Sequence, residues 1–133
     1  MTLVAFILAL GPAATAADRD EIVAARQAEA WLALVDAHKY GESWDAASTL
    51  FRDTVARDMW IDAVGAVRNP LGKPLSRHVK SMESRTSLPG APDGKYVIIQ
   101  YDASFEHKKN AVETITPMLE EDGSWKVTGY FFK

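Results

Sequence analysis

Two carboxylates and one tyrosine near the end of the chain could carry out acid–base chemistry. Asp102 and Glu113 fall in neighbouring runs that alternate like β-strands, and Tyr130 falls in the next run. If Phe105 pairs with Asn110 across the intervening turn, Asp102 lies directly opposite Glu113, and Glu113 shares a face of the sheet with Tyr130. Like charges opposite one another destabilise a sheet, so the repulsion between the two carboxylates must be reduced by water, by a nearby cation or by a bound proton.

This predicted pair has two interpretations. In the first, the pKa values of the two carboxyls are split, the pair acts as general acid and base, and Tyr130 donates a hydrogen bond. In the second, Asp102 and Glu113 lie on a solvated outer face and form salt bridges with Lys80 or Arg85 of the neighbouring strand. We favour the second, because a shift of one residue in the strand register separates the pair.

A second set of polar side chains could bind a small ligand. The same register places Tyr101, Thr114 and Thr116 on the face that packs against helices. One phenol and two hydroxyls at the mouth of a cavity would suit a small polar ligand. The alternative is that these are ordinary strand residues, since Tyr and Thr have high β propensity.

Composition argues against several other chemistries. The chain has no cysteine, which removes disulfides, thiol nucleophiles and zinc–cysteine sites. Its histidines (His38, His78 and His107) lack the spacing of metal ligands. We therefore expect no metal and no cofactor. The net charge is −3 and no run of five like charges occurs, so nucleic acid is not an expected partner.

The strands that carry these residues occupy the last third of the chain. Alternation predicts strands over residues 96–105, 110–119 and 124–132, joined by turns at 106–109 and 120–123. Asp122-Gly123 is a strong hairpin signal. Pro117 cannot donate to a sheet ladder, so a bulge there would shift the register. A polar run over 76–88 predicts a fourth strand, an edge protected by its positive charges.

The preceding residues have helical spacing. Apolar side chains recur on one side of residues 18–40, and Tyr40-Gly41 is the expected end of this helix. A second helix follows from residue 42, and a third runs from Thr54 to Asn69-Pro70. We therefore predict a single α+β domain over residues 17–133, with N-terminal helices packed on a curved four-stranded antiparallel sheet.

The first sixteen residues predict a secretory signal peptide. Residues 3–10 are uniformly apolar, Gly11-Pro12 breaks the run, and residues 14–16 form an A-x-A site with cleavage between Ala16 and Ala17. No Lys or Arg precedes Asp18, so the true start of the chain could lie elsewhere. The alternative is an uncleaved anchor, but the apolar run is shorter than the ~20 residues that span a bilayer. We expect a periplasmic or secreted protein that contacts the membrane only through this peptide.

Several fragments resemble one bacterial family of exported proteins. The most specific is the closing D-G-x-W-x-V-x-G-Y pattern over residues 122–130, and the likeness runs from about Ala28 to Lys133. Further matching fragments are Ala28 to Leu32, Asp36, Tyr40, Ser43-Trp44, Phe51-Arg52, Trp60, Pro70 to Gly72, Ser76-Arg77, Asp93 to Val97 and Glu113-Thr114. The chain is similar to the domain-of-unknown-function 4019 (DUF4019) family. The resemblance implies export and a cone like that of nuclear transport factor 2, also called cystatin-like, but it implies no activity.

Besides a scaffold role in a larger envelope complex, two functions remain open on these observations. The first is a non-enzymatic exported module that binds a small ligand or another protein, with a homodimer through the exposed sheet face as one arrangement. The alternative is a small enzyme that uses the carboxylates and Tyr130 inside the cone for proton transfer or hydrolysis. Ligand and partner are not identified by the sequence. The burial of Asp102 and Glu113 distinguishes these two functions, because an acid–base pair must face an enclosed cavity rather than bulk water.

Overall fold

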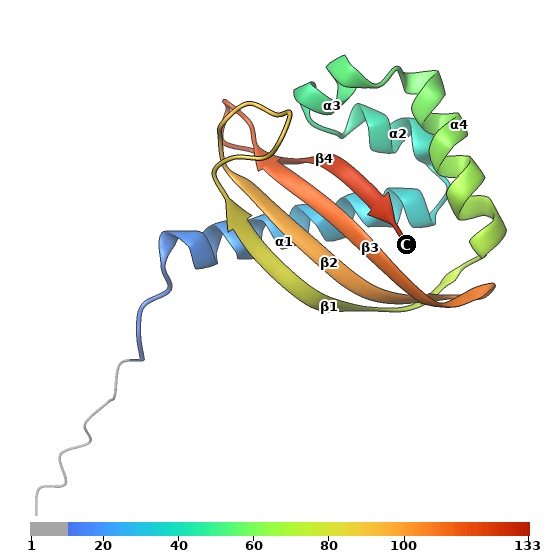
Figure 1. Cartoon of the computed structure of the whole chain (residues 1–133), viewed down its shortest axis with the longest axis horizontal. Coiled ribbons are helices and arrows are strands. Elements are labelled where there is room, and N and C mark those ends of the chain that lie inside the picture. The colour runs from blue at the N-terminus through green and yellow to red at the C-terminus, as the bar shows by residue number, and fades with distance from the viewer. Residues whose placement is uncertain (1–10) are drawn as a thin grey trace, which may run out of the picture.

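The computed structural model describes residues 11–133, so most of the predicted signal peptide lies outside the described residues. Helices come first and a four-stranded antiparallel sheet follows, which confirms the predicted α+β class (Figure 1). None of the described helices has the length and apolar character needed to cross a membrane. The elements in chain order are α1 Ala16–Asp36, α2 Tyr40–Asp45, α3 Thr49–Thr54, α4 Arg57–Arg68, a 3-10 turn Asn69–Leu71, β1 Pro74–Arg85, β2 Tyr96–Phe105, β3 Lys108–Leu119 and β4 Trp125–Phe132.

The long helix α1 is defined at both ends by local chemistry. Thr15 caps its start, accepting a hydrogen bond from the Asp18 amide, while the Asp18 side chain accepts one from the Thr15 amide. At its other end His38 adopts a left-handed conformation with φ of 60°. This residue turns the chain, so α1 ends at Asp36 rather than at the predicted Tyr40-Gly41, and Tyr40 begins α2 instead. The buried side of α1 consists of Ala24, Ala28, Trp31, Leu32 and Val35.

The short helix α2 joins α1 to α4 through one buried serine. The Ser43 carbonyl accepts a hydrogen bond from Trp31 Nε1 at 2.8 Å, and Ser43 Oγ accepts one from Trp60 Nε1 at 2.9 Å. Both indole rings lie in the apolar core, with their centroids 5.9 Å apart. The helix tryptophans therefore have structural partners, as ordinary core residues do.

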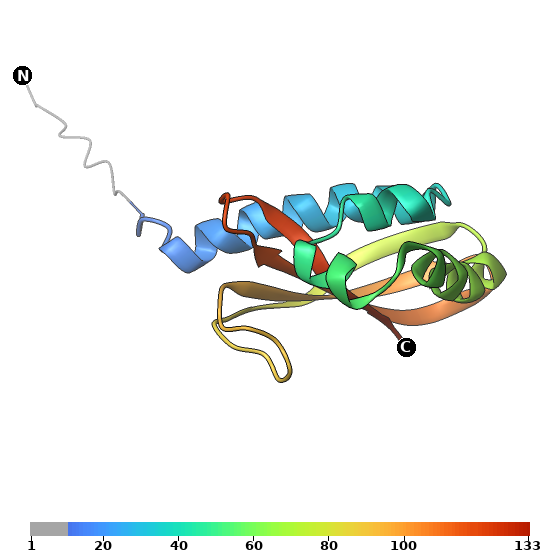
Figure 2. The ribbon, with the colours of Figure 1, turned by 90° about the horizontal axis from the view of Figure 1, so that it is seen from above.

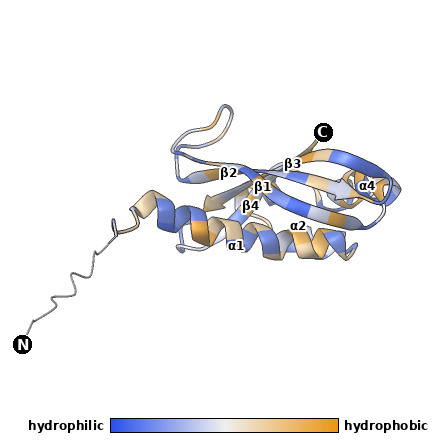
Figure 3. Ribbon diagram, turned by 90° about the horizontal axis from the view of Figure 1, so that it is seen from below, coloured by the Kyte–Doolittle hydropathy of each residue, from blue (hydrophilic) through white to orange (hydrophobic). Residues whose placement is uncertain are grey.

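The sheet has one covered face and one open face. Its strand order is β1-β2-β3-β4, with all neighbours antiparallel. Helix α1 runs along one face, called here the inner face, whereas the loop over residues 86–95 lies on the opposite, outer face (Figures 2 and 3). Tyr96 points outward beneath this loop, where its hydroxyl donates to the Pro92 carbonyl. The apolar core fills the space between the helices and the inner face.

The register between β2 and β3 differs from the predicted one by a single residue. Tyr101 pairs with Glu113 and Asp102 pairs with Val112. The turn is shorter than expected, since β3 already begins at Lys108. An irregularity between Ala103 and Phe105 then shifts the pairing of the residues farther from the turn. Every β3 side chain therefore lies on the face opposite to the predicted one.

A second irregularity lies between Thr116 and Pro117, where the sequence indicated a bulge. It shifts the pairing of β4 so that Trp125 and Val127 before the shift, and Tyr130 and Phe132 after it, all lie on the inner face. Glu113 and Tyr130 therefore share a face, as predicted, but it is the inner face toward the helices and not the predicted outer face.

Candidate functional site

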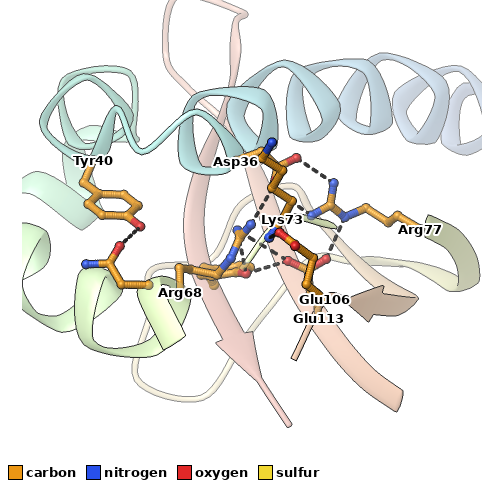
Figure 4. Close-up of polar contacts among 9 residues, drawn as sticks. Asp36, Tyr40, Arg68, Lys73, Arg77, Glu106 and Glu113 are labelled. Atoms are coloured by element: carbon orange, nitrogen blue, oxygen red, sulfur yellow. Dashed lines mark hydrogen bonds and ion pairs between the residues drawn. The ribbon is translucent and has the colours of Figure 1, made fainter. Parts of the chain in front are cut away.

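Five polar side chains meet on the inner face of the sheet and form the largest polar assembly inside the domain. We call Asp36, Arg68, Arg77, Glu113 and Tyr130 the charge cluster. Figure 4 shows Asp36, Arg68, Arg77 and Glu113 pointing toward one another. Asp36 is the last residue of α1, Arg68 the last of α4, Arg77 lies on β1, Glu113 on β3 and Tyr130 on β4. The cluster therefore joins five separate elements.

Glu113 accepts a hydrogen bond on each of its carboxylate oxygens. Arg77 Nε donates to Oε1 at 2.6 Å, and the Tyr130 hydroxyl donates to Oε2 at 2.5 Å. Arg68 Nη1 lies 3.9 Å from Oε2 and 3.4 Å from the Tyr130 oxygen. The Glu113 side chain has no exposed surface, so its charge is compensated entirely by protein groups.

Asp36 bridges the two arginines from the helix side. Its Oδ1 accepts from Arg68 Nη2 at 2.6 Å and from Arg77 Nη2 at 3.1 Å, and its Oδ2 accepts from Arg77 Nη1 at 2.9 Å. The cluster thus contains two carboxylates and two guanidinium groups, whose charges balance. Arg68, only 2% exposed, also stacks its guanidinium over the Phe105 ring at 4.9 Å.

The proton affinities of the cluster follow from burial and these bonds. Burial alone would raise the pKa of Asp36, but the hydrogen bonds from Arg77 and Arg68 outweigh it and hold that pKa below its usual value near 3.8. Burial alone would lower the pKa of Arg77, but its bonds to Asp36 and Glu113 raise it. Burial, followed by the charge of Glu113, raises the pKa of Tyr130 far above that of a free phenol. The arginines and Asp36 therefore stay charged and Tyr130 stays neutral near neutral pH.

Tyr101 lies beside the cluster but is not bonded to it. It faces inward opposite Glu113 and is 3% exposed, and its buried hydroxyl has no hydrogen-bond partner among the described residues. Burial, followed by the charge of Glu29, raises the pKa of Tyr101 to about 12. Of the three residues predicted to line a ligand pocket, Tyr101 is the one that lies on the helix-facing side.

The register places the other predicted site residues elsewhere. Asp102 is exposed on the outer face, opposite His78 and Val112, so the expected Asp102–Glu113 pair does not form. Thr114 and Thr116 also face outward, where Gln100 Nε2 lies 3.5 Å from Thr114 Oγ1. These expectations were wrong because the register was displaced by one residue.

Sequence reasoning named Tyr130 as a hydrogen-bond donor but missed the other charged members of the cluster, although the sequence carries a signal for two of them, Arg68 and Asp36. Arg68 continues the buried stripe of α4 at a four-residue spacing after Trp60 and Val64, and Asp36 continues that of α1 in the same way after Leu32. A charged side chain on an apolar helix stripe requires a buried partner of opposite charge. Two such stripes ending in opposite charges predict an ion pair between the helices.

Two of the surface grooves that border β4 lie apart from most of the cluster. The first, the α1–β4 groove, has a volume of about 400 Å³ and contains none of the cluster residues. It is lined by Val23, Gln27, Ala30, Trp31, Leu34, Ala46, Gly123, Ser124, Trp125, Lys126 and Val127. The second, the β4-edge groove, measures about 340 Å³ and contains Tyr130 from the cluster. It is lined by Leu50, Phe51, Thr54, Val55, Gly90, Thr128, Gly129, Tyr130 and Phe131. Within residues 11–133, no group of three acidic or histidine side chains could hold a metal ion.

Comparison with known proteins gives one match. A family model described as a protein of unknown function, DUF4019, matches residues 27–130. This range includes all five residues of the charge cluster and the D-G-x-W-x-V-x-G-Y pattern over residues 122–130. A search of curated proteins found no match.

Proposed function

The chain belongs to the DUF4019 family of proteins of unknown function, and we propose that it is an exported, non-enzymatic module that binds a small apolar ligand carrying a negative charge. The ligand would occupy the α1–β4 groove. One observation carries this proposal: two tryptophan rings, Trp31 and Trp125, line the groove together with a single ionisable side chain, Lys126.

The composition of the α1–β4 groove suits such a ligand. Trp31 and Trp125 are 4% and 6% exposed, so most of each ring is already packed and the groove wall is preformed. Val23, Leu34 and Val127 extend the apolar wall, while Gln27 and Ser124 offer hydrogen bonds. A groove of about 400 Å³ lies within the size range of small-molecule sites. Lys126 lies between Trp125 and Val127 on β4, so its side chain leaves from the outer face. It would reach around the edge strand β4 to contact the anionic group of the ligand.

The surroundings of Glu113 support the non-enzymatic part of the proposal. A general base must lie within hydrogen-bond reach of the proton that it abstracts, so a substrate must be able to approach it. Both oxygens of Glu113 already accept hydrogen bonds, and the side chain has no exposed surface. Asp102, the other candidate, is exposed on the outer face without a polar partner from the cluster. The acid–base pair that the alternative function needs is therefore divided between two faces of the sheet.

The proposal can be tested with two anionic apolar probes, 8-anilinonaphthalene-1-sulfonate and laurate. We expect the purified folded protein to enhance the fluorescence of the first probe and laurate to displace it. Ala30→Trp would fill the groove and abolish binding. Ala33→Trp is the matched control, because Ala33 is also exposed on α1 but does not line the groove. Binding that survives Ala30→Trp, or that both variants lose equally, would contradict the assignment.

A further inference from the structure

The second half of β4 has an open hydrogen-bonding edge. Val112 and Lys133 exchange two backbone hydrogen bonds, at 3.0 and 2.9 Å, so Lys133 faces β3. Because alternate residues of an antiparallel strand face the same neighbour, Gly129 and Phe131 also face β3, whereas Tyr130 and Phe132 direct their N–H and C=O groups away from it. Within residues 11–133, no backbone group outside the sheet bonds to Tyr130 or Phe132.

An apolar groove accompanies this edge. The β4-edge groove is bounded by Leu50, Phe51 and Val55 on α3 and its C-terminal cap, and by residues 128–131 of β4. Earlier in β4, α3 covers the edge itself, since the Ser48 amide donates to the Val127 carbonyl at 2.8 Å. Beyond that point the edge is not covered in this way, and Phe131 is 67% exposed on the outer face. An extended chain laid here would gain both backbone bonds and apolar contact.

The two edge strands of the sheet differ in how they are protected. β1 carries four charged side chains (Arg77, Lys80, Glu83 and Arg85) and has a register irregularity between Val79 and Ser81. Charges and bulges of this kind prevent an edge from pairing with other chains. Residues 127–132 of β4 contain no charged side chain. The fold therefore protects one edge and leaves the other available.

The charges on either side of the open edge of β4 indicate what kind of chain it would bind. Lys126 and Lys133 flank the uncharged run, and neither takes part in an ion pair among the described residues. A partner strand with acidic ends would complement both lysines. An antiparallel second copy of this chain would instead bring its own Lys133 close to Lys126 at each end of the pairing, which is unfavourable.

We propose that residues 128–132 of β4 bind an extended segment of a partner protein as a fifth strand. This segment has an uncharged centre of β-branched or aromatic residues and an acidic residue toward each end. The site shares Lys126 with the lining of the α1–β4 groove, but its backbone edge and Phe131 lie outside that groove, so Phe131→Glu tests the edge without altering the groove.

A pair of synthetic peptides tests the proposal. The first has alternating valine and threonine between two glutamates, and the second has lysines in place of the glutamates. We expect the labelled glutamate peptide to bind, measured by fluorescence anisotropy, and the lysine peptide to bind at least about tenfold more weakly. Binding should slow hydrogen exchange at the Tyr130 and Phe132 amides. The double variant Lys126→Glu/Lys133→Glu should reverse the peptide preference.

Exposed apolar residues provide a matched control for the same experiment. Phe131→Glu should weaken binding about tenfold, whereas Met59→Glu should leave it unchanged, because Met59 is equally exposed, at 67%, but lies on α4. Absence of peptide binding, indifference to the end charges or equal effects of the two glutamate variants would overturn the proposal. A concentration-dependent dimer in sedimentation that Phe131→Glu abolishes would also overturn it, in favour of a second copy.

Discussion

Both oxygens of Glu113 accept hydrogen bonds from side chains that the sequence places far away, Arg77 from β1 and Tyr130 from β4. Burying a carboxylate is costly unless partners of opposite charge surround it. Here Arg68 and Arg77 supply that charge, and Asp36 balances the second guanidinium. One member of the predicted carboxylate pair is thus a component of a compensated ion network.

Removal of the Glu113 charge should strongly destabilise the protein. Glu113→Gln leaves Arg68, which is 2% exposed, and Arg77 with Asp36 as their single anionic partner. We expect the free energy of unfolding to fall by about 3–5 kcal/mol, as when one partner of a buried pair is lost. Urea denaturation measures the change. Asp45→Asn is the control: its pair with Arg57 is exposed, so that variant should unfold close to wild type.

Stability should also fall in acid because of Asp36. The folded-state pKa of Asp36 lies below the usual value near 3.8, so the unfolded chain takes up a proton at a higher pH than the folded protein does. The stabilisation from Asp36 is therefore complete above that usual value and is lost as the pH falls through the folded-state pKa. Urea midpoints measured between pH 7 and pH 3 test this, with Asp36→Asn expected to show a flatter pH dependence. An equally steep loss in the variant would assign the acid sensitivity to other groups.

At the scale of elements, the strands could be predicted from alternation but their pairing could not. The runs over 96–105 and 124–132 differ little from β2 and β4, and the irregularity at Pro117 follows from its missing N–H. The β2–β3 register depends on a shorter turn and on the irregularity near Phe105, and neither has a glycine or proline to mark it. This local feature decided whether Glu113 pointed to water or to the core.

The junction of α1, α2 and α4 depends on one buried hydroxyl. Ser43 Oγ accepts from Trp60 Nε1 and donates to the Tyr40 carbonyl at 2.6 Å. Ser43→Ala would leave the Trp60 indole N–H without a partner in the core, at a cost of about 1–3 kcal/mol. Urea denaturation followed by tryptophan fluorescence would report the change. Ser81→Ala on the exposed part of β1 should have little effect, and equal losses in both variants would contradict the role of Ser43.

At the scale of the whole molecule, helices followed by an antiparallel sheet could be predicted because each element has its own periodicity. The complete charge cluster could not, because its members come from five elements and meet only through tertiary packing, although the charged ends of the apolar stripes on α1 and α4 indicate the pair of Asp36 and Arg68. Export and a homodimer through the sheet face stay predictions. Within residues 11–133, the structure adds that α1 begins at Ala16, next to the predicted cleavage site.

Cleavage of the signal peptide should be visible in the mass of the mature protein. If it occurs after Ala16, the chain isolated from the periplasm or the medium begins at Ala17 and lacks Thr15, which caps α1. The new amino group would then lie at the positive end of the helix, with Asp18 partly offsetting the repulsion. Intact-mass spectrometry of the exported protein tests this directly. A retained mass for residues 1–16 would show that the segment is not removed.

The charge cluster also has a consequence for the fidelity of folding. A slip of β3 by one residue would turn Glu113 to the outer face and leave Arg68 and Arg77 in the interior with Asp36 alone. An apolar inner face tolerates a misaligned strand if its replacement side chains are apolar, as Val112 and Met118 are. Burying two guanidinium groups without a second carboxylate would strongly destabilise the misaligned sheet. The cluster therefore favours the correct register of β3, because only in that register does each buried charge have a partner of opposite charge.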